Sequence, residues 1–78
     1  MLFLIQYDRN HGMIVQIQEF NDSERKKAAD SRLNLEIELN RQGIEREVVL
    51  LEAESIEALR RTHRRYFEDA CELTKQTL

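Results

Sequence analysis

The first twenty residues hold two apolar-rich segments, of which residues 2–5 are apolar without interruption and residues 15–18 alternate between apolar and polar side chains with the two-residue period of β-strands. Residues 2–8 and 13–20 are rich in strand-forming side chains, and a turn-like segment separates them. We expect a β-hairpin with a three-residue loop, residues 10–12, in which Gly12 adopts a left-handed backbone conformation. This loop gathers most of the large apolar side chains on one face: Phe3, Ile5, Tyr7, Met13, Val15 and Ile17. The other face carries three glutamines and three apolar residues: Gln6, Gln16, Gln18, Leu2, Leu4 and Ile14.

A helical period follows the hairpin. Asn21 is a typical helix N-cap, and Glu24, three residues later, completes a capping-box pattern. Gly43 is a typical residue at the C-terminal end of a helix. The sequence therefore predicts a helix over residues 22–42.

The apolar side chains of this helix form two seams, separated by Arg32 and Glu36, which are spaced to pair with each other. The first seam comprises Ala28, Leu35 and Leu39, and the second seam comprises Ala29, Leu33 and Ile37. A helix that rests only on a sheet needs a narrower apolar stripe. We therefore expect the second seam to meet another helix, from this chain or from a partner.

Residues 44–52 read as a third strand, which is apolar on both faces from Val48 to Leu51. Ser55 can cap a last helix that runs from Ile56 to about Lys75. One arc of that helix is apolar: Ile56, Leu59, His63, Tyr66, Phe67, Ala70 and Leu73.

The predicted fold is a single small α+β domain, residues 1–78, of order ββαβα. Its three-stranded sheet has the order 2-1-3, with both helices packed on one face.

This arrangement leaves the second face of the sheet without cover. That face would carry five apolar side chains: Leu2, Leu4, Ile14, Val49 and Leu51. Large apolar patches are rarely bare on a soluble monomer, so we predict a homodimer through this face or through the second seam. Pairing of the second strand's edge with another chain is a further alternative.

Composition narrows the class of protein. The net charge of −3 argues against a protein that coats DNA, whose affinity needs a large positive excess. The single cysteine, Cys71, fits a reducing compartment, and we expect a cytoplasmic protein. The apolar run of residues 2–5 is too short for a signal peptide or a membrane span, so we expect no membrane association.

One basic cluster departs from this acidic composition. Its arginines fall on one side of the predicted last helix: Arg60, Arg61, Arg64 and Arg65. Acidic residues lie four positions away, at Glu57, Glu68 and Asp69, so the cluster reads first as an internally paired, solvated face. The alternative is a surface for an anionic partner, either a nucleic acid or an acidic protein.

The sequence predicts no metal ion or cofactor. His11, His63 and Cys71 lack the spacing of a metal site, and there is no glycine-rich phosphate loop. We interpret His63 as a buried residue bonded to the backbone or to a hydroxyl such as that of Tyr7 or Tyr66. Cys71 reads as a packing residue, because its place late in a helix disfavours a thiolate. Glu45 and Glu47 share one strand face and read as solvent-facing.

Three functions follow from these features. The leading hypothesis is a small homodimeric interaction or adaptor module with no catalysis of its own, for which a second protein partner is an alternative to self-association. The second is a nucleic-acid-binding accessory protein that uses the four arginines. The net charge of −3 does not favour this hypothesis. The third is a small enzyme or ligand-binding domain with a pocket between two subunits, lined by His63 or Tyr7. The absence of paired catalytic groups in the sequence weighs against an enzyme.

Overall fold

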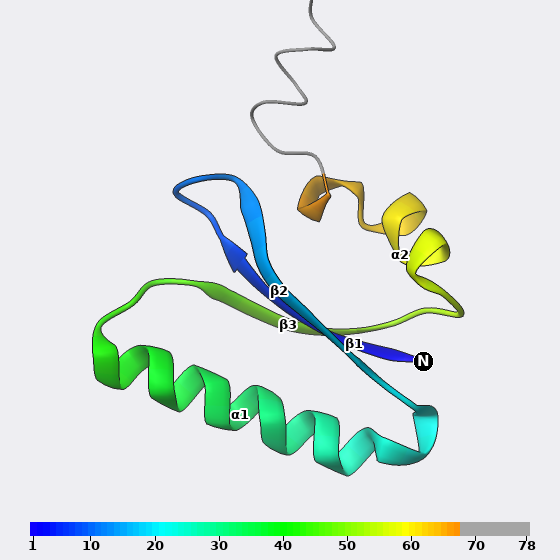
Figure 1. The fold of residues 1–78 in the computed structure, drawn as a ribbon, viewed down its shortest axis with the longest axis horizontal. Coiled ribbons are helices and arrows are strands. Elements are labelled where there is room, and N and C mark those ends of the chain that lie inside the picture. Colours follow the sequence, from blue (N-terminus) through cyan, green and yellow to red (C-terminus); the bar gives the residue numbers. More distant parts are fainter. Residues whose placement is uncertain (68–78) are drawn as a thin grey trace, which may run out of the picture.

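The computed structural model describes residues 1–67, in which a three-stranded antiparallel sheet carries helices on both of its faces (Figure 1). The strands are β1 (Leu2–Asp8), β2 (Met13–Phe20) and β3 (Glu47–Glu52), in the order β2-β1-β3. The helices are α1 (Arg25–Gln42) and α2 (Ile56–Thr62), with short 3₁₀ turns η1 (Asp22–Glu24) and η2 (Arg64–Tyr66). The predicted α+β class, the order of these elements and the strand order are confirmed.

The central strand β1 is covered on both faces. Four consecutive side chains, Leu2, Phe3, Leu4 and Ile5, are at most 4% exposed. Because successive side chains of a strand point to opposite faces, burial of all four requires a layer above and a layer below the sheet. The continuous apolar run at the start of the chain therefore specifies the middle of the sheet.

The two helices supply these layers from opposite sides, so the prediction that both pack on one face is wrong. Ala28 of α1 belongs to the core cluster that contains Leu4, whereas Leu59 of α2 belongs to the cluster of Phe3 and Ile5. Figure 1 shows α1 and α2 separated by the sheet. The physical reason is the run in β1: a second helix on the α1 side would leave Phe3 and Ile5 bare.

The β1–β2 hairpin combines two registers. From Leu2 to Gln6 the strands pair in the register that a three-residue loop predicts. Val15 is then an extra residue at a β-bulge, beyond which the pairing shifts by one residue and Asp8 lies opposite Met13. The predicted loop length is therefore wrong, because four residues, 9–12, connect the strands.

Asp8 explains the longer loop. Its carboxylate accepts hydrogen bonds from the backbone N–H groups of Asn10 (3.0 Å) and His11 (3.3 Å), and Gly12 closes the loop with φ 62°. The shifted register moves Ile14 to the same face as Phe3 and Ile5, not to the glutamine face.

The helix α1 begins and ends near its predicted residues. The backbone N–H of Asn21 donates to Oε1 of Glu24 at 3.0 Å, and the first turn is the 3₁₀ helix η1. Gly43 adopts φ 70°, and its N–H donates to the carbonyl oxygen of Asn40 at 3.1 Å. Local capping signals therefore define both ends of this helix.

β3 begins at Glu47 instead of residue 44, because Tyr7 of β1 is the last residue that it pairs with. The helix α2 begins as predicted, where Oγ of Ser55 accepts a hydrogen bond from the N–H of Ala58 at 3.1 Å. It ends at Thr62, well before the predicted Lys75, because His63 leaves the helical conformation with φ −126° and ψ 54°. The rest of the predicted helix, residues 68–75, lies outside the described residues.

Candidate functional site

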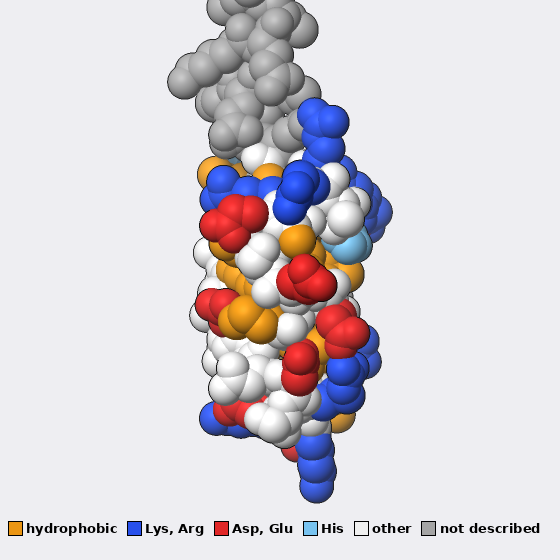
Figure 2. All heavy atoms as spheres, turned by 90° about the vertical axis from the view of Figure 1, so that its right-hand side faces the viewer, with side chains coloured by type: hydrophobic (Ala, Val, Ile, Leu, Met, Phe, Trp, Pro, Cys, Tyr) orange, Lys and Arg blue, Asp and Glu red, His pale blue; other side chains and the backbone are white. Residues whose placement is uncertain are grey.

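The four arginines of the basic cluster lie on two short elements instead of one continuous helix. Arg60 and Arg61 belong to α2, Arg64 and Arg65 belong to η2, and all four are exposed. Figure 2 shows Lys and Arg side chains gathered at the end of the molecule where these elements lie. The single helix face predicted for them is therefore not formed, because the chain bends at His63.

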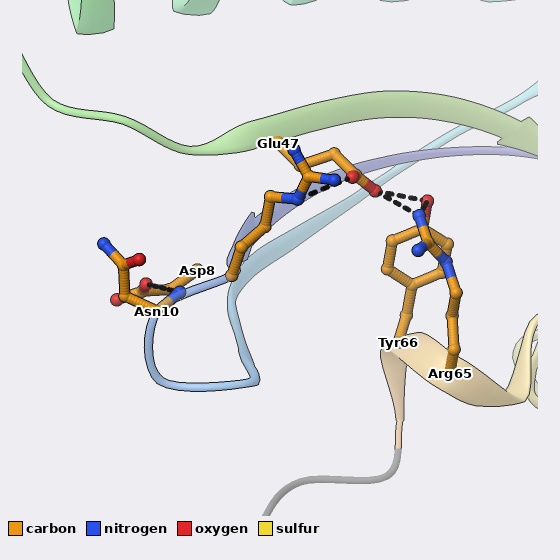
Figure 3. Close-up of polar contacts among 6 residues, drawn as sticks. Asp8, Asn10, Glu47, Arg65 and Tyr66 are labelled. Carbon is orange, nitrogen blue, oxygen red and sulfur yellow. Dashed lines mark hydrogen bonds and ion pairs between the residues drawn. The ribbon is translucent and has the colours of Figure 1, made fainter.

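One of these arginines takes part in a group of polar side chains that the sequence did not predict. Nη2 of Arg65 lies 2.7 Å from Oε2 of Glu47 and donates to the hydroxyl of Tyr66, also at 2.7 Å. The Tyr66 hydroxyl donates to the same Glu47 oxygen (Figure 3). Nε of Arg9 lies 3.5 Å from Oε1 of Glu47. Glu47 is thus the common partner of three side chains from the hairpin loop and η2.

These contacts determine the charge of each group. The hydrogen bond from Tyr66 lowers the pKa of the Glu47 carboxyl, and the charges of Arg65 and Arg9 add to this shift against the opposing effect of burial. Burial, together with the hydrogen bond to Glu47, raises the pKa of the Tyr66 hydroxyl. Glu47 therefore stays ionised and Tyr66 stays a neutral donor, which attaches η2 to β3.

Aromatic contacts complete this attachment. The rings of Tyr7 and Tyr66 meet edge to face with their centroids 5.2 Å apart, and Tyr66 is 7% exposed. Glu47 of β3 lies directly opposite Tyr7 of β1, because the two residues are paired in the sheet. No pattern in the sequence links Glu47 to Tyr66, because their contact depends on the end of the helix at His63.

Two of the four arginines, Arg60 and Arg65, contact side chains of the same fold. The charge of Arg65 is matched by Glu47, and the Arg60 guanidinium lies over the ring of Phe67, 5.4 Å from its centroid. Two of the acids expected to neutralise the cluster, Glu68 and Asp69, lie outside the described residues. Binding of nucleic acid at this end of the molecule stays a prediction.

The residues considered for metal or catalytic chemistry are held in other ways. His63 is half-buried instead of buried, and its Nδ1 lies 2.9 Å from a hydroxyl, as expected, but from that of Thr62 instead of a tyrosine. Nδ1 of His11 lies 2.7 Å from Asp8 in the hairpin loop. Within residues 1–67, no three His, Cys, Asp or Glu side chains are grouped where they could hold a metal ion. Cys71 lies outside the described residues.

The predicted dimer face is not one face of the sheet. Leu2 and Leu4 lie on the α1 side, whereas Ile14, Val49 and Leu51 lie on the α2 side. The grouping fails because Val49 pairs with Ile5 and Leu51 with Phe3, a register one residue away from the one that would place them beside Leu4. Each half of the set is sheltered by a helix of the same chain.

An open hollow of about 660 Å³ lies between α1, the hairpin loop and the start of β3. Arg9 and Arg46 line it, but both are engaged elsewhere, since Arg9 contacts Glu47 and Nε of Arg46 lies 3.9 Å from Asp8. This hollow, like two smaller ones in the described part of the chain, is not lined by His63 or Tyr7. The enzyme hypothesis places its pocket between two subunits, so it stays a prediction.

The outer side of α1 is the candidate interaction surface. The first seam faces the sheet, where Ala28 is fully buried and Leu39 is 8% exposed. The second seam faces away from it: Leu33 is 53% exposed, Ile37 is 54% exposed and Ala29 is also exposed. Figure 1 shows the sheet on one side of α1 and no other described element on the opposite side. Two adjacent turns of the longest helix thus present large apolar side chains to solvent.

Comparison with known proteins returned no match: no protein-family model, curated protein or solved structure is similar to this chain. In the part of the chain that the structure describes, no helix is long and apolar enough to cross a membrane.

Proposed function

We propose that this chain is a homodimeric interaction module without catalysis of its own, and that it associates through the second seam of α1. The observation that carries the proposal is the exposure of Leu33 and Ile37, 53% and 54%, in the middle of an 18-residue helix. Single exposed apolar side chains are common, but here Ala29, Leu33 and Ile37 form one strip along the helix axis. A partner surface would remove this strip from water, which is favourable by roughly 25 cal/mol for each Å² of apolar area.

The polar clusters of the described residues support the proposal indirectly, because the fold itself accounts for them. Glu47, Arg65 and Tyr66 attach η2 to β3. Asp8 and His11 shape the hairpin loop. The second seam, in contrast, is left exposed by residues 1–67. Association is the function that would bury it.

The size of the chain gives an independent reason for association. A domain of 78 residues buries a small core, and its stability is the narrow difference between apolar burial and conformational entropy. Burial of additional apolar surface between two copies would add to the favourable side of this balance. Dimers with two-fold symmetry are the commonest soluble oligomers.

Sedimentation equilibrium from low to high micromolar concentration tests the proposal. We expect the wild-type chain to approach twice its 9.3 kDa mass and the double variant L33S/I37S to stay monomeric. The matched control is M13S/V15S, which removes two apolar side chains of similar exposure, 46% and 47%, from β2. A monomeric wild-type chain would overturn the proposal, as would a dimer that survives L33S/I37S but dissociates in M13S/V15S.

A further inference from the structure

The charges along α1 are divided unevenly between its two halves. Residues 25–33 carry four basic side chains and one acidic side chain, whereas residues 34–42 carry two acidic and one basic. An antiparallel pair keeps the basic N-terminal ends of the two helices, Arg25, Lys26 and Lys27 of each copy, at opposite ends of the contact, whereas a parallel pair places them together. From this asymmetry we infer that α1 packs antiparallel against α1 of a second copy of the chain, an inference that rests on the proposed function.

The second seam fits itself in this arrangement. At about 100° and 1.5 Å for each residue, Leu33 and Ile37 lie about 40° apart on the helix surface and about 6 Å apart along the axis. A two-fold axis between these positions sets Leu33 of each copy opposite Ile37 of the other. The centre of the contact thus consists of two equivalent Leu–Ile pairs, which form because the seam is self-complementary.

The same register sets opposite charges across from each other on both flanks. Under this symmetry, residues on one flank of α1 face the same flank of the second copy. Asp30 then lies level with Arg41 of the second copy, since both project from the Ile37 side of the seam at matching heights. On the other flank, Arg32 and Glu36 of the second copy lie farther round the helix from the centre of the contact, where only extended side chains would meet. Each pairing occurs twice in the dimer.

The side chains that would make these contacts are accessible. Arg41 is 75% exposed and pairs with Glu38 at 2.8 Å on the surface of its own helix, a contact of the kind that rearranges at little cost. Arg32 and Glu36 are 49% and 42% exposed, and their closest polar atoms are 3.9 Å apart. Asp30 is exposed and makes no ion pair within residues 1–67.

The contact should be modest in strength. A helix of 18 residues is about 27 Å long, and a pair of such helices buries less surface than a standard protein interface. We therefore expect a dissociation constant in the micromolar range. At this affinity the flanking charges contribute measurably to the dimer, which makes them suitable for a test.

Charge reversal at Asp30 and Arg41 tests the orientation. D30K alone and R41E alone each place like charges opposite each other at two symmetric contacts, so we expect each to weaken its dimer about tenfold. An equimolar mixture should form a mixed dimer in which both contacts join opposite charges. Native mass spectrometry detects it as a species of intermediate mass, in excess over both homodimers. The mixture of neutral variants D30N and R41Q is the control, and it should show no such excess.

The outcomes separate this inference from the proposed function. A statistical mixture of D30K and R41E, or unweakened dimers of either variant, would overturn the antiparallel register. If the wild-type dimer is still dissociated by L33S/I37S in that case, the proposed function survives and the helices pack in another orientation. A monomeric wild-type chain would overturn both. Far-UV circular dichroism shows whether each variant retains the helix content of the wild type.

Discussion

At the scale of single residues, Glu47 connects three segments of the described chain. It receives a hydrogen bond from Tyr66 and lies beside the charges of Arg65 and Arg9. Its neighbours come from the hairpin loop and from η2, segments far apart in the sequence (Figure 3). One carboxylate thereby connects the end of the described chain to the sheet. It also makes stability sensitive to pH, because the contacts require its charge.

We expect Y66F to destabilise the fold by about 1 kcal/mol at neutral pH, because it removes the hydroxyl that donates to Glu47. The folded-state pKa of Glu47 lies below its ordinary value of 4.5, so its stabilising contribution is fully present above that value. The contribution is lost as the pH falls through the folded-state pKa. Urea unfolding at neutral and acidic pH should therefore show a smaller loss in acid for Y66F than for wild type.

The matched control for this variant is Y7F, which removes a hydroxyl that makes no hydrogen bond within residues 1–67. It should unfold like the wild type at both pH values. Asp8, whose pKa is also lowered, chiefly by its hydrogen bond with His11, leaves some acid sensitivity in every variant. Equal destabilisation by Y7F and Y66F would contradict the role given to the Tyr66 hydroxyl.

At the scale of elements, the hairpin tolerates its loop length because β2 carries a bulge. The four-residue loop alone would put every β2 side chain on the wrong face, and the extra residue Val15 reverses this shift. Beyond the bulge, Phe20 reaches the α1 side of the sheet, where it is 3% exposed. The bulge therefore compensates for the extra residue of the loop, and the rest of β2 keeps the correct face.

Deletion of Val15 should be tolerated, because it joins the two registers into one ladder without moving any other side chain to the opposite face. We expect its free energy of unfolding to stay within about 1 kcal/mol of the wild type. Deletion of Val49 is the control, since β3 is the other edge strand and its register is unbroken. That deletion should cost more than about 2 kcal/mol, because later β3 side chains change face. Equal costs in urea unfolding would contradict this account.

Elements with local signals could be predicted from the sequence, and elements that depend on distant contacts could not. The capping pair of Asn21 and Glu24 and the left-handed Gly43 fix α1 through neighbouring residues alone. The helical pattern after Ser55 continues past residue 63, but the bend there lets Tyr66 reach Glu47, a contact that no local pattern reveals. Tertiary contacts thus override helix periodicity in the second half of the predicted helix.

At the scale of the whole molecule, the two helices lie on opposite faces of the sheet. The uncovered apolar face that the sequence predicts is therefore not formed. An apolar run in β1 needs cover on both faces, and α2 provides the second cover from within the chain. The central strand β1 therefore needs no cover from a partner, whereas Met13, Val15 and Ile17 of the edge strand β2 stay 46%, 47% and 37% exposed.

The two seams of α1 could be recognised from their period, but only the structure shows that Leu33 and Ile37 face solvent while Leu39 is buried. Of the two dimer contacts expected from the sequence, the sheet face is sheltered by helices of the same chain and the second seam stays exposed.

Association through α1 should also appear in the thermal stability of the chain. Unfolding of a dimer yields two separate chains, so mass action raises the midpoint temperature as the protein concentration increases. We expect this rise for the wild type and for M13S/V15S in calorimetric scans from low to high micromolar concentration. L33S/I37S should unfold at one temperature throughout, because its second seam no longer associates. A wild-type midpoint that does not move with concentration would contradict the dimer, whatever the stability of the monomer.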